Sequence, residues 1–105
     1  MTEFRLYLIQ RVTAALLLGL GLVHLGTILS ATEAPLSAAD ILARTRASAL
    51  WPIFYGVFVL AAATHAAIGL RTIAREWLGW RRDIWVMALW LALTGLGLRA
   101  VWGIA

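Results

Sequence analysis

Two histidines, His24 and His65, lie inside apolar stretches of this 105-residue chain. An imidazole inside a membrane costs free energy unless a ligand, a proton path or a neighbouring polar group makes use of it. Neutral imidazole is also the usual protein ligand of haem iron. The two side chains can therefore bind haem, carry protons or hydrogen-bond to a neighbouring helix.

Small and polar residues share a helical face with each histidine. One such face holds Gln10, Thr13, Leu17, Gly21 and His24, and the other holds Phe58, Ala61, Ala62, His65, Gly69, Thr72 and Glu76. Small residues allow the close approach of another helix or of a flat macrocycle. Ordinary helix packing, with each histidine bonded to a carbonyl on a neighbouring helix, is the alternative.

The expected depths of the two histidines decide whether one iron could hold both. At 1.5 Å per residue, His24 lies about 20 Å from the membrane edge near residues 9–11. His65 precedes Arg71 by six residues and lies about 9 Å from the same edge. If both bind haem, they bind different haems, and each haem takes its second ligand from another chain. That chain is a second copy or a similar three-helix subunit.

Apolar residues make up 63% of the chain and gather in three runs, 6–30, 50–70 and 84–104. A soluble domain this small could not hide so much apolar surface, and each run approaches the ~20 residues that cross a bilayer. We expect an all-α membrane protein in which residues 1–105 form a single domain. Its three transmembrane helices cover about 6–30, 50–77 and 84–104. Ser37 and Asp40 predict a capping box that starts a short surface helix over about 38–48.

All nine basic residues are arginine, and they flank the apolar runs. A net charge of +4 is compatible with nucleic-acid binding, but the positive-inside rule accounts for arginines that flank the apolar runs. The end expected in the cytoplasm carries Arg5, Arg11, Arg71, Arg75, Arg81 and Arg82. The first loop carries Arg44 and Arg46, offset by Glu33 and Asp40. We expect the N-terminus and the second loop inside, the C-terminus outside, no nucleic-acid partner, and a bacterial inner membrane.

Two classes of function are disfavoured by what the chain lacks. It has no cysteine, which excludes iron–sulfur clusters and disulfides within it. Small multidrug transporters are four-helix chains with a carboxylate embedded in the first span. Here three spans are expected, and none of the three apolar runs carries an acidic residue.

Four side chains gather at the expected cytoplasmic edge: Tyr7, Arg11, Glu76 and Trp77. A quinone site at a membrane edge needs donors to two carbonyls and a route for protons, which these groups can provide. Plainer roles exist for each of them. Arg11 can be a topology charge, the two aromatic rings can be interface anchors, and Glu76 can pair with Arg75 or Thr72.

Arg99 lies about five residues from the end of the third apolar run. Its long side chain can reach outward to the headgroups. The alternative is an ion pair with a haem propionate near His24.

Two motifs resemble those of the cytochrome b anchor subunits of succinate dehydrogenase and fumarate reductase. Residues 10–14, Gln-Arg-Val-Thr-Ala, resemble the Arg-x-Ser/Thr-Gly/Ala signature that opens their first helix. Residues 64–71, Thr-His-Ala-Ala-Ile-Gly-Leu-Arg, resemble their second-helix motif, His-x-x-x-Gly-hydrophobic-Arg. Residues 75–77 resemble the acidic–aromatic pair that follows this motif in the smaller anchor subunit. The length, the three-helix layout and the ending Trp102-Gly103-Ile104 agree with the resemblance.

The resemblance implies roles for the edge residues. His65 would be an axial ligand of haem b, and Arg11 would line a ubiquinone or menaquinone pocket near the iron–sulfur subunit. Glu76 and Trp77 would lie where the family has an acidic residue and a tyrosine that hydrogen-bonds the quinone. Trp77 departs from that pattern, because indole donates a hydrogen bond but supplies no phenolic proton. Tyr7 matches a quinone-contacting serine by position only.

His24 falls outside the single-haem pattern and resembles the first-helix histidine of di-haem anchors. We therefore expect the di-haem type of anchor subunit in a succinate:quinone oxidoreductase. It would hold the flavoprotein and iron–sulfur subunits beside a second three-helix anchor. FAD and the clusters would belong to those partners, so this chain alone would be no complete enzyme. A haem-free structural subunit of a respiratory or photosynthetic complex and a haem b anchor of another quinone-linked dehydrogenase are the alternatives.

Overall fold

The computed structural model describes residues 2–31 and 37–104, and this part of the chain is helical with no strand. The elements are α1 (Glu3–Ala31), α2 (Ala38–Arg46), α3 (Leu50–Ile73), the π-helix η1 (Ala74–Leu78) and α4 (Ile84–Ile104). Three of them, with η1 continuing α3, are long and apolar enough to cross a membrane. The predicted fold class is thereby confirmed. Glu33, which we expected to offset the first-loop arginines, lies outside the described residues.

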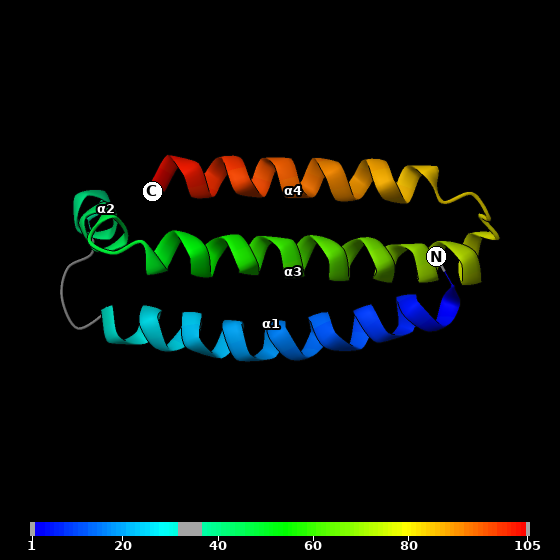
Figure 1. Cartoon of the computed structure of the whole chain (residues 1–105), viewed down its shortest axis with the longest axis horizontal. Coiled ribbons are helices and arrows are strands. Elements are labelled where there is room, and N and C mark those ends of the chain that lie inside the picture. The colour runs from blue at the N-terminus through cyan, green and yellow to red at the C-terminus, as the bar shows by residue number, and fades with distance from the viewer. Residues whose placement is uncertain (1, 32–36, 105) are drawn as a thin grey trace.

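Helix α3 is the central element of the molecule. Helices α1 and α4 each pack against α3, and within the described residues they make no contact with one another. In Figure 1 the three run side by side, with the α3–α4 connection at the same end as the N-terminus. The buried alanines Ala61, Ala63 and Ala67 all lie on α3, so its neighbours approach it closely. The molecule is 49 Å long, enough to span the hydrocarbon core and both headgroup layers.

Helices α3 and α4 approach one another closely at Gly97. A Cβ atom built at Gly97 would overlap the Val59 side chain, so only glycine fits without a shift of that side chain or of one helix. Further along the same pair of helices, Trp90 Nε1 donates a hydrogen bond to Thr64 Oγ1 at 2.9 Å. This bond satisfies a polar group that would otherwise face hydrocarbon.

Helix α2 lies at the opposite end of the molecule from the N-terminus and contacts α3 and α4. Ser37 caps it as predicted, since its hydroxyl accepts a hydrogen bond from the Asp40 amide at 3.1 Å. The helix ends at Arg46, two residues before the predicted end. Ile41 on this helix is exposed.

The second span ends at Leu78, close to the predicted residue 77, but through a π-helix that the sequence did not indicate. Over η1 the helix widens, and Gly79 closes it with φ +68°. The Trp80 amide then bonds back to the Ala74 carbonyl at 3.2 Å. A residue with a Cβ atom is disfavoured at this φ, which is why glycine stands here.

Four charged residues form an ion-pair cluster, made up of Glu3, Arg71, Arg75 and Asp83, that joins the ends of all three long helices. Arg71 is buried and contacts Glu3 at 2.7 Å and Asp83 at 3.1 Å. Arg75 contacts Asp83 at 3.0 Å and Glu3 at 3.7 Å. The hydrogen bonds from Arg75 and Arg71 lower the pKa of the Asp83 carboxyl below its ordinary value. The cluster thus fixes the end of the molecule where the predicted quinone residues lie.

Candidate haem and quinone site

His65 faces α1 and makes one hydrogen bond there. Its Nδ1 atom lies 3.2 Å from the hydroxyl of Thr13, which is buried between the two helices. Nε2 of His65 has no hydrogen-bond partner among the described residues. The packing alternative placed a backbone carbonyl opposite each histidine, whereas the structure places a hydroxyl group there. One ring nitrogen is therefore satisfied and the other is open to a ligand.

Small residues on α3 leave room beside His65. Ala62, Ala66 and Gly69 follow one another at helical spacing and stay partly exposed. They lie on the side of α3 turned away from Thr64 and Ala67, which belong to another face. A flat ligand or a partner helix can approach the backbone along this strip.

A cavity of about 400 Å³ continues from the strip along the seam between α1 and α3. Tyr7 and Gln10 line it from α1, and Gly69 and Thr72 line it from α3. Gln10 Oε1 is buried there without a hydrogen-bond partner in the part of the chain that the structure describes. A buried acceptor without a donor destabilises the protein unless a bound group supplies one. The cavity is therefore suited to a ligand with a polar end.

Arg11 and Tyr7 form a pair on α1. The Arg11 Nε atom donates a hydrogen bond to the Tyr7 hydroxyl at 3.2 Å, and its guanidinium lies 5.2 Å from the centre of the Tyr7 ring. Both side chains are exposed. Tyr7 reaches the cavity, while Arg11 remains available to a group outside this chain.

Glu76 and Trp77 lie in η1, close to the ion-pair cluster in sequence but outside it. Neither Arg75 nor Thr72 pairs with Glu76, since Arg75 contacts Asp83 and Thr72 donates to the Ile68 carbonyl. Trp77 is 81% exposed. Both side chains therefore point to surroundings that this chain does not provide, as expected for groups that contact a ligand or a partner.

His24 lies deeper in the bundle than His65, among aromatic side chains. Its Nδ1 atom is 3.3 Å from the Tyr55 hydroxyl, and its ring packs edge-on against Tyr55 and Phe58. Thr13, which faces His65, precedes His24 by eleven residues on α1, or about 16 Å. This separation agrees with the prediction that one iron could not hold both histidines.

Arg99 lies on α4, nine residues after Trp90, and thus half a turn out of phase with it. Since Trp90 faces α3, Arg99 faces away from α3 and is exposed. The structure does not bring Arg99 and His24 together, because their helices pack on different sides of α3. The contact with a haem propionate stays a prediction.

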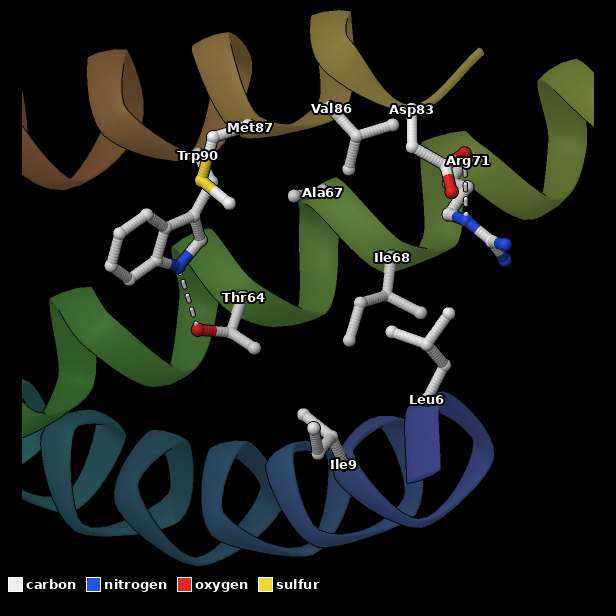
Figure 2. Close-up of a pocket in the computed structure, with 10 residues that line it drawn as sticks. All are labelled: Leu6, Ile9, Thr64, Ala67, Ile68, Arg71, Asp83, Val86, Met87 and Trp90. Atoms are coloured by element: carbon white, nitrogen blue, oxygen red, sulfur yellow. Dashed lines mark hydrogen bonds and ion pairs between the residues drawn. The ribbon is translucent and has the colours of Figure 1, made fainter. Parts of the chain in front are cut away.

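A second hollow lies between α1 and α4 on another face of α3 (Figure 2). This groove of about 440 Å³ is mainly apolar, with Leu6 and Ile9 on one wall and Trp90 on the other. Arg71 and Asp83 lie together at its mouth. None of the predicted ligand-binding residues lines it, although Leu6, Ile68 and Arg71 line both this groove and the cavity between α1 and α3.

The comparison with protein families decides which group of proteins this arrangement represents. Residues 2–98 match the family model described as succinate dehydrogenase/fumarate reductase transmembrane subunit. The chain belongs to this family. It is a multi-pass transmembrane subunit of succinate dehydrogenase/fumarate reductase, and membership implies association with the flavoprotein and iron–sulfur subunits. A search of curated proteins and a search of solved structures each found no match.

Several residues that shape the site had no predicted role. Thr13 and Gln10 were placed on the correct face of the first helix, but their contacts with His65 and Gly69 were not foreseen. Tyr55 was not predicted as the partner of His24. Their hydroxyl and amide groups within apolar runs were the available signal, since such groups need partners in lipid.

Proposed function

We propose that this chain is the haem b-binding anchor subunit of a succinate:quinone oxidoreductase and helps to form its quinone site. The observation that carries the proposal is the pair of ring nitrogens of His65, one bonded to Thr13 and the other open. Ligating histidines commonly have this arrangement, with one nitrogen on the metal and the other in a hydrogen bond. Family membership supports the same function.

The residues around His65 fit a haem group. The strip of Ala62, Ala66 and Gly69 stays partly exposed and admits a flat macrocycle. Among the described residues no three metal-ligating side chains gather, which suits a haem, since its porphyrin supplies the other donors. When bound, haem supplies one-electron transfer. A partner chain would supply the second axial ligand, and a second three-helix anchor is the partner we propose.

The quinone end of the proposal rests on the exposed groups near the ion-pair cluster. Arg11 and Tyr7 present a cation and a phenol on one side, and Glu76 presents a carboxylate without a partner among the described residues. A cation polarises a quinone carbonyl, and a carboxylate next to water relays protons to it. Trp77 would close the pocket by packing and by donating from its indole nitrogen.

The placement of the subunit follows from its charges. Six arginines lie at or near the end that holds the N-terminus and the α3–α4 connection, so we propose that this end faces the cytoplasm of a bacterium. The flavoprotein and the iron–sulfur subunit would dock at this end. FAD and the clusters belong to them.

The first experiment counts haem b per chain in the detergent-purified native complex by pyridine haemochrome. His65→Ala should remove one haem, because no other described side chain at that level can replace the imidazole. Unchanged haem content after His65→Ala would refute the ligand role. A complex that holds no haem at all would instead favour a haem-free structural subunit.

The predicted second haem at His24 is tested in the same preparation, with His24→Ala as the matched variant. The native complex should then hold two haems, and His24→Ala should remove one of them and spare the other. This result would support a second haem at His24. Unchanged haem content and spectrum would make His24 a packing residue held by Tyr55 and Phe58.

Arg11→Leu tests the quinone site. We expect quinone reduction to fall about 10- to 100-fold, since a charged hydrogen bond to the quinone is worth roughly 1.5–3 kcal/mol. Succinate oxidation by an artificial dye should persist, because the soluble subunits carry it. Equal loss of both activities would point to failed assembly and would contradict the role in quinone binding.

A further inference from the structure

We propose that Thr13 is a positioning residue that holds His65 in the tautomer with its proton on Nδ1 and thereby directs the lone pair of Nε2 to the haem iron. The proposal rests on the proposed ligand role of His65. It concerns the hydroxyl group that lies between α1 and α3, and it assigns to that hydroxyl a function beyond packing.

Three possible hydrogen-bond partners surround the Thr13 hydroxyl, which has one proton. The Ile9 carbonyl lies at 2.8 Å, the Gln10 carbonyl at 3.0 Å, and Nδ1 of His65 at 3.2 Å. A carbonyl oxygen only accepts hydrogen bonds, whereas imidazole nitrogen accepts or donates according to its protonation. The question is therefore which neighbour takes the hydroxyl proton.

The distances assign the proton to the carbonyls. If Thr13 donated to His65, its lone pairs would face two carbonyl oxygens at 2.8 and 3.0 Å with no proton between them, and the contacts would be repulsive. With the proton shared between the carbonyls, the hydroxyl oxygen is free to accept. His65 must then donate from Nδ1, and its Nε2 carries the lone pair.

The surroundings of Thr13 keep this arrangement in place. Thr13 is 7% exposed, so water does not compete for its hydroxyl. Threonine in a helix has few χ1 rotamers, and a back-bond to the preceding turn selects one of them. The hydroxyl is thus a fixed acceptor at the side of the ring opposite to the metal-binding nitrogen.

His24 shows that a hydroxyl contact alone does not fix a tautomer. The proton of Tyr55 has no other acceptor among the described residues, so the phenol can either donate to Nδ1 of His24 or accept from it. Thr13 differs because its hydroxyl proton is already bonded to the Ile9 and Gln10 carbonyls of α1. The assignment therefore applies to His65 and not to His24.

The hydrogen bond has an electronic consequence that packing lacks. A proton shared by Nδ1 raises the basicity of Nε2, and a more basic ligand favours the oxidised iron over the reduced iron. Thr13→Val keeps the shape of the side chain and removes the acceptor. The haem should then bind less tightly and become easier to reduce.

The experiment uses the purified native complex and compares Thr13→Val with Thr13→Ser and Thr27→Val. Loss of the hydrogen bond that orients a ligating histidine commonly weakens metal binding by 10- to 100-fold. We expect Thr13→Val to lower haem affinity about tenfold. We also expect a tenfold smaller preference for oxidised haem, which raises the midpoint potential by about 59 mV. Thr13→Ser keeps the hydroxyl and should show the wild-type haem affinity and midpoint potential. Thr27→Val removes an α1 hydroxyl that bonds only to the Val23 carbonyl and should change neither.

The outcomes separate this proposal from the proposed function. A Thr13→Val complex that keeps the wild-type potential and haem affinity would overturn the positioning role, whatever His65→Ala does. If Thr13→Ser changes the midpoint potential and haem affinity as much as Thr13→Val does, the positioning role is also overturned, because packing and not the hydroxyl would then be the cause. If His65→Ala retains all haem, the ligand role itself fails.

Discussion

The two histidines of this chain each contact one hydroxyl group, and these hydroxyl groups differ in what holds their own protons. The Thr13 proton is bonded within α1, while that of Tyr55 has no acceptor besides His24 in the described residues. An imidazole takes its tautomer from the bond that its other nitrogen makes. We therefore expect a single tautomer at His65, with Nε2 unprotonated, whereas the surroundings of His24 leave both tautomers accessible.

Gly97 lies where α3 and α4 leave no room for a Cβ atom. Gly97→Ala should destabilise the complex by about 1–3 kcal/mol, because the added methyl group overlaps the Val59 side chain, and that side chain or one helix must move. Thermal unfolding of the purified complex measures the effect. Gly95→Ala is the control, since a Cβ atom there meets nothing within 4 Å and alanine favours the helix.

The cause of the Gly97→Ala effect can be checked by a second substitution. Val59→Ala removes the methyl groups that the new Cβ atom would meet, so the double variant should recover part of the stability lost. If the two losses simply add, or if Gly95→Ala is as harmful as Gly97→Ala, the close contact is not what glycine provides at this position.

At the residue scale, the sequence predicted which side chains face a site but not what each one touches. The helical spacing placed Thr13 and His65 on inward faces, and the family motif singled out His65. Which residue of α1 lies opposite His65 depends on the axial register of the two helices. That register follows from packing along the whole of α3, with its alanines and Gly69, and no local pattern encodes it.

At the scale of the elements, hydropathy alone placed the three spans to within a few residues. The first helix begins at Glu3 and not near residue 6, because Glu3 pairs with Arg71 across the bundle and stabilises an extra turn. The π-helix η1 was not predicted, since π-helices are rare and no local pattern in the sequence marks this one. The helix ends at Gly79, where the φ of +68° favours glycine.

The central position of α3 gives each of its faces a separate use. One side packs against α1 and carries His65, and another packs against α4 through Val59 and Thr64. The strip of Ala62, Ala66 and Gly69 stays partly open. A three-helix chain in which α1 and α4 do not touch leaves α3 accessible, so a partner helix or a cofactor can reach it directly.

At the scale of the whole molecule, the chain buries little of its apolar surface within itself. Of the third span's most apolar window none is buried, and of the second only 22%. Such exposure is stable only against lipid or other subunits. The contacts that join the three helices within the chain therefore lie mainly in the alanine-rich seams of α3 and in the ion-pair cluster at one end.

Asp83→Asn tests that ion-pair cluster through its dependence on pH. Because hydrogen bonds from Arg75 and Arg71 lower the pKa of Asp83 in the folded protein, its stabilisation is present above the ordinary carboxyl pKa. That stabilisation is lost as the pH falls below about 3.9 and through the lowered folded value. At pH 7 the variant should lose about 0.5–1 kcal/mol, since the carboxylate is half exposed and its ion pairs are screened.

Thermal unfolding of the full chain in detergent micelles measures this loss as about 4 °C at pH 7. The difference between Asp83→Asn and the parent should stay constant down to about pH 5 and shrink as the pH falls below 3.9. Glu76→Gln is the matched control, because Glu76 makes no ion pair within the described residues and its replacement should leave the unfolding temperature unchanged. A difference that persists undiminished in acid would mean that Asp83 contributes by shape and not by charge. In that case the cluster would not be what joins the end of α3 to the start of α4.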